Sequence, residues 1–338
     1  MGLASSPRGL WLRSEESRKW RCLLNLRARL YMPILFTLTA ALFPGSASGQ
    51  QAGHYIEAAT GLENGSAPPP GIFVNYMAIA NPINSIKGPN GNTIARPDID
   101  LVAHFMGYAV TTDKKILGAN YGLMFLVPAV NTRFTSTLFD ASAEAAGVSD
   151  VFFAPIVLGW EKGNANYILN YGFYAPSGNF NPALPLNPGL GFWEHQVQGG
   201  MTYSLDKKKL WNTSVLTTWE INMSKTGLDV KPGPMFTAEY SFGRRFFKYA
   251  GNIGAVGAAY KKLSPDSGSG INPLVAGLTD RSFSAGGEIK FTDPFVHLGF
   301  DFRFEQQFGV ESKTSGQLFV IGITFLDLLH PPPRPPKK

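Results

Sequence analysis

The sequence predicts an all-β protein, an antiparallel up-and-down transmembrane β-barrel of about 12 strands. Three observations predict this fold class. Apolar and polar side chains alternate with a period of two in many stretches, which is the period of a strand. Most strand candidates have 10 to 14 residues, which is longer than usual in globular sheets and enough to cross a bilayer at a tilt. The connections between them alternate between short and long.

Residues 1–49 have the pattern of a cleaved secretory signal peptide. Seven basic residues precede an apolar run at 30–43, and the small residues of GSASGQ (45–50) follow it. An uncleaved membrane anchor is the alternative, for which this run is short. The leader carries 7 basic and 2 acidic residues, so its removal lowers the formal charge from +6 to +1. The mature chain therefore gives no indication of a nucleic-acid partner, and it lacks cysteine, because Cys22 lies in the leader.

Three further segments follow the leader. Residues 50–70 are expected to form an N-terminal periplasmic or plug segment, residues 71–326 the barrel, and residues 327–338 a Pro-rich basic tail. No apolar run of 18 or more residues follows the leader, so helical membrane spans are not indicated. The strand candidates lie at roughly 71–80, 97–111, 115–128, 151–161, 164–176, 192–205, 209–223, 234–243, 248–261, 282–292, 295–308 and 316–326.

The stretch HLGFDFRFEQQF (297–308) has the strictest alternation. Phe300, Phe302 and Phe304 share one face of the predicted strand, and Asp301, Arg303 and Glu305 share the other. In a soluble sheet the aromatic face would form the core. In a membrane barrel the aromatic face contacts lipid and the charged face lines the lumen.

The connections favour the membrane reading. Short turns are expected at TTDKK (111–115), EKGN (161–164), LDKKK (205–209), GRRFFK (243–248) and TDP (292–294). The remaining connections are mostly longer, as at 81–97, 131–150, 176–191 and 262–281. Outer-membrane barrels have short turns at the periplasm and long loops outside, whereas a soluble sandwich has no reason to sort its loops in this way.

Four segments resemble the SphA-like, meta-pathway of phenol degradation family of outer-membrane proteins: APPPGIFVNY (67–76), FFAPIVLGW (152–160), NYGFYAPSGNF (170–180) and GLGFWEHQVQGGMTYSLD (189–206). The resemblance implies a barrel that passes hydrophobic or aromatic compounds, in contact with outer-membrane lipid and the outer-membrane assembly machinery. It supplies no set of ligand residues. One departure is that Phe325 does not end the chain, although many such barrels end on an aromatic residue that signals assembly.

Ionisable residues at inward-facing positions are the candidate lumen lining. Their mixed charges suggest pairing across the barrel, and a selectivity role for any one of them is the alternative. The candidates are Glu194, Glu220, Glu239, Glu288, Lys290, His297, Asp301, Arg303 and Glu305.

Two early strands offer a candidate apolar path. Both faces of VFFAPIVLGW (151–160) are apolar, with Phe152, Ile156 and Leu158 on one and Val151, Phe153 and Val157 on the other. Pro155 indicates a bulge or an opening in the wall. Apolar packing against a plug formed by residues 50–70 is a compatible alternative. The path candidates are Met124, Leu126, Val151, Phe153 and Val157.

Enzyme chemistry has little support in the sequence. The histidines show no HExxH spacing, and there is no GxSxG elbow, phosphate loop or zinc cluster, so no cofactor is expected. A hydrolase that uses His297 is the least favoured reading. The sequence thus predicts a channel or transporter in the bacterial outer membrane for small hydrophobic or aromatic compounds. The alternative is a structural or adhesive barrel with a closed lumen.

Overall fold

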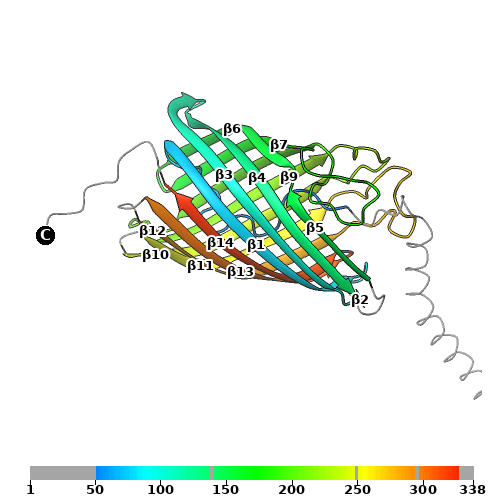
Figure 1. The fold of residues 1–338 in the computed structure, drawn as a ribbon. Coiled ribbons are helices and arrows are strands. Elements are labelled where there is room, and N and C mark those ends of the chain that lie inside the picture. Colours follow the sequence, from blue (N-terminus) through cyan, green and yellow to red (C-terminus); the bar gives the residue numbers. More distant parts are fainter. Residues whose placement is uncertain (1–50, 137–140, 248–249, 294–296, 327–338) are drawn as a thin grey trace, which may run out of the picture. The chain divides into compact units, whose positions relative to one another are not determined.

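A closed antiparallel barrel is the fold of the chain (Figure 1). The computed structural model describes residues 51–136, 141–247, 250–293 and 297–326, so the leader and tail expected from the sequence lie outside the described residues. No helix in this part of the chain is long and apolar enough to cross a membrane. The twelve long strands in it are β1 (Gly71–Lys87), β3 (Asp98–Ile116), β4 (Ala119–Ser136), β6 (Val151–Lys162), β7 (Ala165–Ala175), β8 (Glu194–Ser204), β9 (Trp211–Asn222), β10 (Met235–Phe246), β11 (Gly251–Lys262), β12 (Arg281–Asp293), β13 (Leu298–Glu311) and β14 (Thr314–Phe325).

Closure comes from the pairing of the last strand with the first. Consecutive long strands pair in sequence order, and β14 returns to β1 with Val74 opposite Phe325 and Ala80 opposite Phe319. Each long strand therefore has a neighbour on both sides. Closure satisfies the backbone N–H and C=O groups that an open sheet would expose to lipid. The predicted fold class is confirmed.

Two short strands extend the wall where the sequence predicted loops. β2 (Thr93–Ala95) pairs with the end of β1, and β5 (Ala141–Val148) pairs with β4 alone. After Pro128 the more buried and the more exposed residues still alternate, as they do in a strand, although many of them are polar. β4 therefore continues to Ser136. The long connection expected at 131–150 is thus largely a hairpin.

Two connections differ from the prediction, one in its position and the other in its length. The segment 111–115 belongs to β3, and the chain reverses at Leu117 and Gly118, both of which have positive φ (50° and 78°). Two residues with positive φ form the tight turn that matches strand twist, and glycine adopts this conformation easily. The connection from β13 to β14 is also short, since only Ser312 and Lys313 separate the strands.

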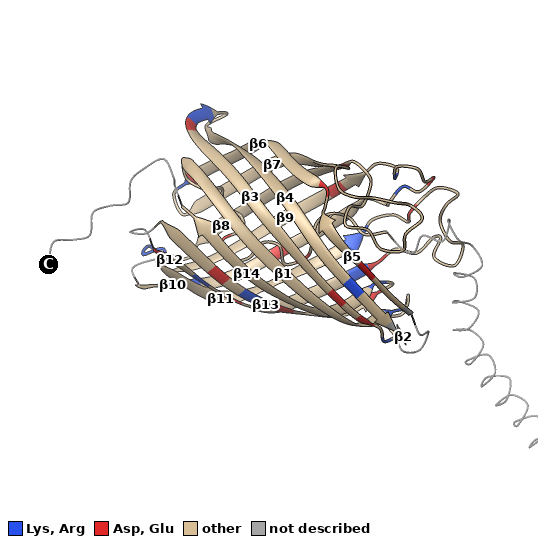
Figure 2. Ribbon diagram, viewed as in Figure 1, with Lys and Arg blue, Asp and Glu red and all other residues tan. Residues whose placement is uncertain are grey.

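The two faces of the wall differ as the alternation of the sequence predicts. On β13, Phe300 and Phe302 are about half exposed (48% and 47%), whereas Arg303 and Glu305 are buried (3% and 1%). In a closed barrel whose interior is filled, the exposed face of the wall is the outer one. Phe300 and Phe302 therefore point outward, and Arg303 and Glu305 point inward. Figure 2 shows that the middle stretches of β1, β3 and β4 carry no charged residue.

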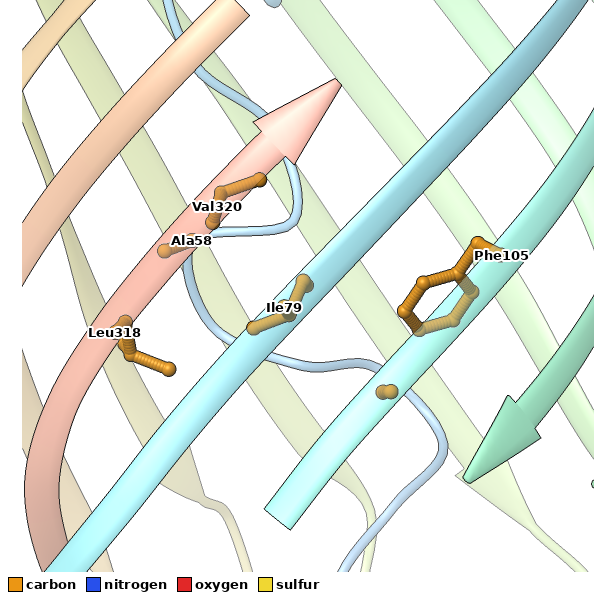
Figure 3. Packing of buried hydrophobic residues seen from close by; sticks show 6 residues of the cluster. Ala58, Ile79, Phe105, Leu318 and Val320 are labelled. Carbon is orange, nitrogen blue, oxygen red and sulfur yellow. The ribbon is translucent and has the colours of Figure 1, made fainter. Parts of the chain in front are cut away.

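Inside the barrel, one wall is apolar and the other is polar. The apolar wall belongs to β1, β3, β4 and β14, where Ile79, Phe105, Leu318 and Val320 form a buried cluster (Figure 3). The polar wall belongs to β8 through β13, whose buried inward side chains are mostly Glu, Gln, Asn, Ser and Thr. The chemistry of the interior therefore changes around the ring of strands.

Candidate functional site: the occupied barrel interior

The N-terminal segment, residues 51–70, enters the space between these two walls. Ala58 is fully buried and packs in the cluster of Ile79, Leu318 and Val320 on the apolar wall, and Ile56 packs against the same cluster. Figure 3 shows Ala58 close to Val320 and Leu318 of β14, and the trace of the segment runs on behind β1 and β3. The opposite side of the segment meets the polar wall, where its backbone groups require partners.

Carboxylates from four strands accept the backbone N–H groups of this segment. A carboxylate that accepts an N–H group makes a charge-assisted hydrogen bond, which is stronger than one between neutral groups. The four bonds run from His54 N to Glu194 (2.9 Å), from Tyr55 N to Glu220 (3.2 Å), from Thr60 N to Glu239 (3.0 Å) and from Leu62 N to Glu288 (2.7 Å).

Cationic side chains of the wall donate to backbone carbonyls of the same segment. Lys262 Nζ donates to the Gln51 carbonyl (2.6 Å), and Lys290 Nζ donates to the Leu62 carbonyl (3.1 Å). Arg303 donates to the carbonyls of Ala58 and Thr60 and also pairs with Glu288 (3.2 Å). The wall thus binds both the donors and the acceptors of the segment's backbone.

Two carboxylates of the segment complete the contacts. Glu57 pairs with Lys313 and accepts a hydrogen bond from Ser282 (2.5 Å). Glu63 pairs with Arg245. Because these charges are paired with groups of opposite sign, the segment can lie in a largely dehydrated interior.

The His54 cluster comprises His54, Asp150, Glu194, Tyr174 and Phe192. His54 Nε2 lies 2.8 Å from Asp150 Oδ2, and Nδ1 lies 2.9 Å from Glu194 Oε2. Its ring stacks on Tyr174 (centroids 4.5 Å apart) and meets Phe192 edge-on (4.8 Å). Burial by itself lowers the pKa of His54, but Glu194 and Asp150 outweigh burial and raise it to about 8. The imidazolium is therefore the form that both carboxylates stabilise at neutral pH.

Asp150 connects this cluster to the connection between β7 and β8. Its carboxylate accepts hydrogen bonds from the backbone N–H groups of Gly178 (2.9 Å) and Leu190 (2.8 Å), in addition to the bond with His54. The hydrogen bonds with His54 lower the pKa of Asp150 despite its burial. One carboxylate thus links the N-terminal segment and residues 176–193.

A cavity of about 250 Å³ separates part of the segment from the apolar wall. Residues 52–57 form one side of it, and His54, Asp150 and Tyr174 are among its polar lining. The apolar part of its remaining lining includes Ile83, Leu101, Phe105, Pro128, Val130, Leu190 and Leu318, and the polar part includes Asn81, Gln307 and Lys313. The interior therefore contains a space in which an apolar solute can contact an apolar wall, with polar groups around it.

The predicted lumen candidates fall into two groups. Six of them contact the N-terminal segment, while Glu305 accepts a hydrogen bond from Ser284 (2.5 Å) and Asp301 lies 3.7 Å from Arg303. His297 departs from the expectation, because it lies in the turn before β13 with a positive φ of 53° rather than along the inward face of the strand. The six are Glu194, Glu220, Glu239, Glu288, Lys290 and Arg303.

The apolar candidates do not share one face. Met124 and Leu126 pack against a buried cluster that includes Val157, and Val151 is half-buried at the start of β6. Phe153 is exposed and pairs with Phe173 on the outer face, so the expectation that it shares a face with Val157 is wrong. The pairing shifts register between Phe153 and Ile156, and this bulge reverses the alternation at Pro155.

Sequence reasoning missed several functional positions. The contacts between the segment and the wall involve five residues that were not predicted: His54, Asp150, Glu57, Lys262 and Lys313. Each of them lies outside the alternating stretches or at the end of one. The spacing of His54 from its partners, 96 and 140 residues, leaves no local signal. Across the described ranges, no group of three His, Cys, Asp or Glu residues is arranged to hold a metal ion.

Comparisons with solved structures agree with this architecture. The chain is similar to the COG4313 outer membrane channel from Pseudomonas putida F1, with a TM-score of 0.64 and 12% identity over 78% of this chain and 97% of that chain. The β domain of the Bordetella autotransporter BrkA matches with a TM-score of 0.43 and 11% identity over 76% and 98% of the two chains. A FadL homologue from Pseudomonas aeruginosa matches with a TM-score of 0.37 and 10% identity over 75% and 89%. The first match supports the fold, and the other two are too distant to carry an argument.

A search of curated protein sequences finds no match to this chain. The family model described as "Putative MetA-pathway of phenol degradation" matches residues 83–321, from within β1 to within β14. This match covers more than half of the chain and nearly all of the barrel. The chain therefore belongs to this family.

Proposed function

We propose that the protein is a channel in the bacterial outer membrane for small hydrophobic or aromatic compounds. The observation that carries this proposal is the apolar cavity of about 250 Å³ inside a closed barrel whose interior is otherwise occupied by the N-terminal segment. Drug-sized ligands occupy pockets of about 300 to 1,000 Å³. The cavity therefore suits a solute smaller than those, such as a single substituted aromatic ring.

The contacts of the segment support an apolar rather than an ionic solute. Charged groups that could attract ions, including Glu288 and Arg303, are already paired with each other and with the backbone of the segment. The apolar wall at Phe105 and Leu318, in contrast, leaves space next to the segment. In this proposal the segment acts as a plug whose displacement opens the route beyond the cavity.

The same proposal includes export by a cleaved signal peptide, insertion by the outer-membrane assembly machinery and contact with outer-membrane lipid. The outward aromatic pairs support the lipid contact. Trp219 lies 4.6 Å from Phe236, and Trp211 lies 5.4 Å from Phe242, between ring centroids. Aromatic residues of this kind form the interfacial girdles of membrane barrels.

Uptake of a radiolabelled toluene-like compound by cells tests the proposal. Val130→Trp places a large side chain in the cavity and should reduce uptake severalfold. Val215→Trp is the matched control, because Val215 faces outward on β9 and is 40% exposed. Both barrels should be present in the outer membrane in equal, heat-modifiable amounts. Equal uptake by cells with the native protein, by cells with Val130→Trp and by cells that lack the protein would contradict the proposal.

A structural or adhesive barrel remains the second candidate function, and the occupied interior is the observation that favours it. The His54 cluster and the ion pairs of Glu57 and Glu63 would then serve only to keep the lumen closed. The same uptake assay separates the two functions. A structural barrel predicts no difference between producing cells and cells without the protein.

A further inference from the structure

Lys225 lies in the connection between β9 and β10 and carries its ammonium group over two aromatic rings. Its Nζ is 5.4 Å from the ring centroid of Phe180 and 5.7 Å from that of Phe192. Backbone hydrogen bonds fix this position, from Lys225 N to the Val230 carbonyl (2.8 Å) and from Thr226 N to the Gly191 carbonyl (2.8 Å). The second bond ties the connection to residues 176–193, which supply both rings.

The ammonium group contacts no anion in the part of the chain that the structure describes. Among the described residues, no carboxylate lies within ion-pair distance of Lys225 Nζ, whereas the interior lysines Lys262 and Lys313 each pair with one. Asp150 and Asp266 act on Lys225 only at longer range, because each is bound elsewhere: Asp150 to His54 and Asp266 to Lys262. Burial without a contacting anion lowers the pKa of Lys225 to about 8, although the two aspartates oppose this change.

We propose that Lys225, Phe180 and Phe192 form a binding site for the carboxylate of a small aromatic acid, at the long-loop end of the barrel. The ammonium group supplies the ion pair and hydrogen bonds that a carboxylate requires. The half-buried Phe180 ring supplies an apolar surface for the ring of the ligand, and the buried Phe192 ring lies under the ammonium group. A single ammonium group carries one positive charge and fits one negative charge rather than a polyanion such as a phosphate ester.

The site adjoins the cavity through one side chain. Phe192 is almost fully buried and contacts the His54 ring edge-on at 4.8 Å, and His54 lines the cavity. Leu190 lies two residues before Phe192 and lines the cavity as well. An aromatic acid held at Lys225 would therefore lie next to the route of the proposed function. The inference rests on that function for its choice of ligand, and it extends the solutes from neutral aromatics to aromatic monocarboxylates.

Binding of two matched probes to the refolded full chain in a non-ionic detergent tests the inference. The probes are 4-fluorobenzoate and 4-fluorobenzyl alcohol, which share a fluorinated ring and differ in charge, and ¹⁹F NMR titration gives each Kd. Lys225→Met should raise the Kd for the benzoate about tenfold or more, because a hydrogen-bonded ion pair is lost. It should leave the Kd for the alcohol unchanged.

Two further variants complete the test. Lys231→Met removes an exposed lysine six residues later in the same connection and should leave both Kd values unchanged. Lys225→Arg retains the charge and should keep the binding of the benzoate. An unchanged Kd for the benzoate in a heat-modifiable Lys225→Met barrel would overturn the inference, as would the absence of benzoate binding to the native chain.

The outcomes separate this inference from the proposed function. If the native chain promotes uptake of neutral aromatics but does not bind the benzoate, the inference fails and the proposed function stands. If the benzoate binds through Lys225 but no aromatic compound is taken up, the site is supported and the proposed function fails.

Discussion

Raising the pH through 8 should release the beginning of the N-terminal segment, because His54 then loses the proton that its carboxylate partners require. His54 contacts Asp150 at 2.8 Å and Glu194 at 2.9 Å, and Tyr174 and Phe192 cover its ring. The carboxylates of Asp150 and Glu194 are the groups that raise the pKa of His54. The groups that face the imidazole are therefore acidic or aromatic, and in the described chain none of its contacts can replace the lost positive charge.

The size of this effect follows from the pKa of His54. The pKa is raised from 6.5 to about 8, and each unit corresponds to about 1.4 kcal/mol, so protonation stabilises the closed arrangement by about 2 kcal/mol. Because the pKa in the folded state is the higher one, this stabilisation is fully present below about pH 6.5 and is lost as the pH rises through about 8. The His54 ring is buried, so solvent screening does not reduce this value appreciably.

Hydrogen exchange of residues 51–66 measures this release. The protection of these amides, corrected for intrinsic exchange, should fall about 30-fold between pH 6 and pH 9, which corresponds to 2 kcal/mol. His54→Gln should show low protection already at pH 6 and no step with pH. Residues 251–262 of β11 serve as an internal control and should stay protected throughout. Equal protection at both pH values in the native chain, or a pH step that persists in His54→Gln, would refute the reasoning.

Three other changes test separate parts of the structure. Arg303→Met should leave Glu288 without its ion-pair partner and two carbonyls of the segment without their donor, at a cost of about 3–5 kcal/mol. It should also raise single-channel conductance, and unchanged conductance would speak against a held segment. Phe302→Lys should destabilise the barrel in lipid vesicles by about 2–4 kcal/mol in urea titrations, because its ring faces outward, and a neutral effect would place that face away from lipid. Gly65→Val should displace the end of the segment, since a Cβ there would lie 2.1 Å from the backbone of Met201; normal protection of residues 60–66 in hydrogen exchange would contradict this.

Much of the wall was predictable from local patterns. The alternation of Phe300 and Phe302 with Arg303 and Glu305 assigns each side chain to a face, because a strand has a period of two. The limits of β6, β7, β8 and β9 agree with the predicted ranges to within two residues. The prediction failed where a turn depends on backbone conformation, as at Leu117, or where polar residues continue a strand, as after Pro128.

The interior was only partly predictable. The inward positions of Glu194 and Glu288 follow from parity, but their partners do not, because His54 and Leu62 lie 140 and 226 residues away. The error at Phe153 has a local cause, because the bulge at Pro155 shifts the pairing register. A pattern with a period of two does not show where such a shift occurs. Contacts between distant segments depend on closure of the barrel, and no short stretch of the sequence shows which residues closure brings together.

The most direct test of the proposed solute path is a crystal structure of the protein soaked with 4-bromophenol, in which anomalous scattering locates the bromine. We expect a bromine peak in the cavity between residues 52–57 and the apolar wall at Phe105, Val130 and Leu318. The peak should be absent from crystals of Val130→Trp. Bromine bound only on the outer face of the barrel, with the cavity empty in the native protein, would contradict the proposal that aromatic solutes pass through this interior.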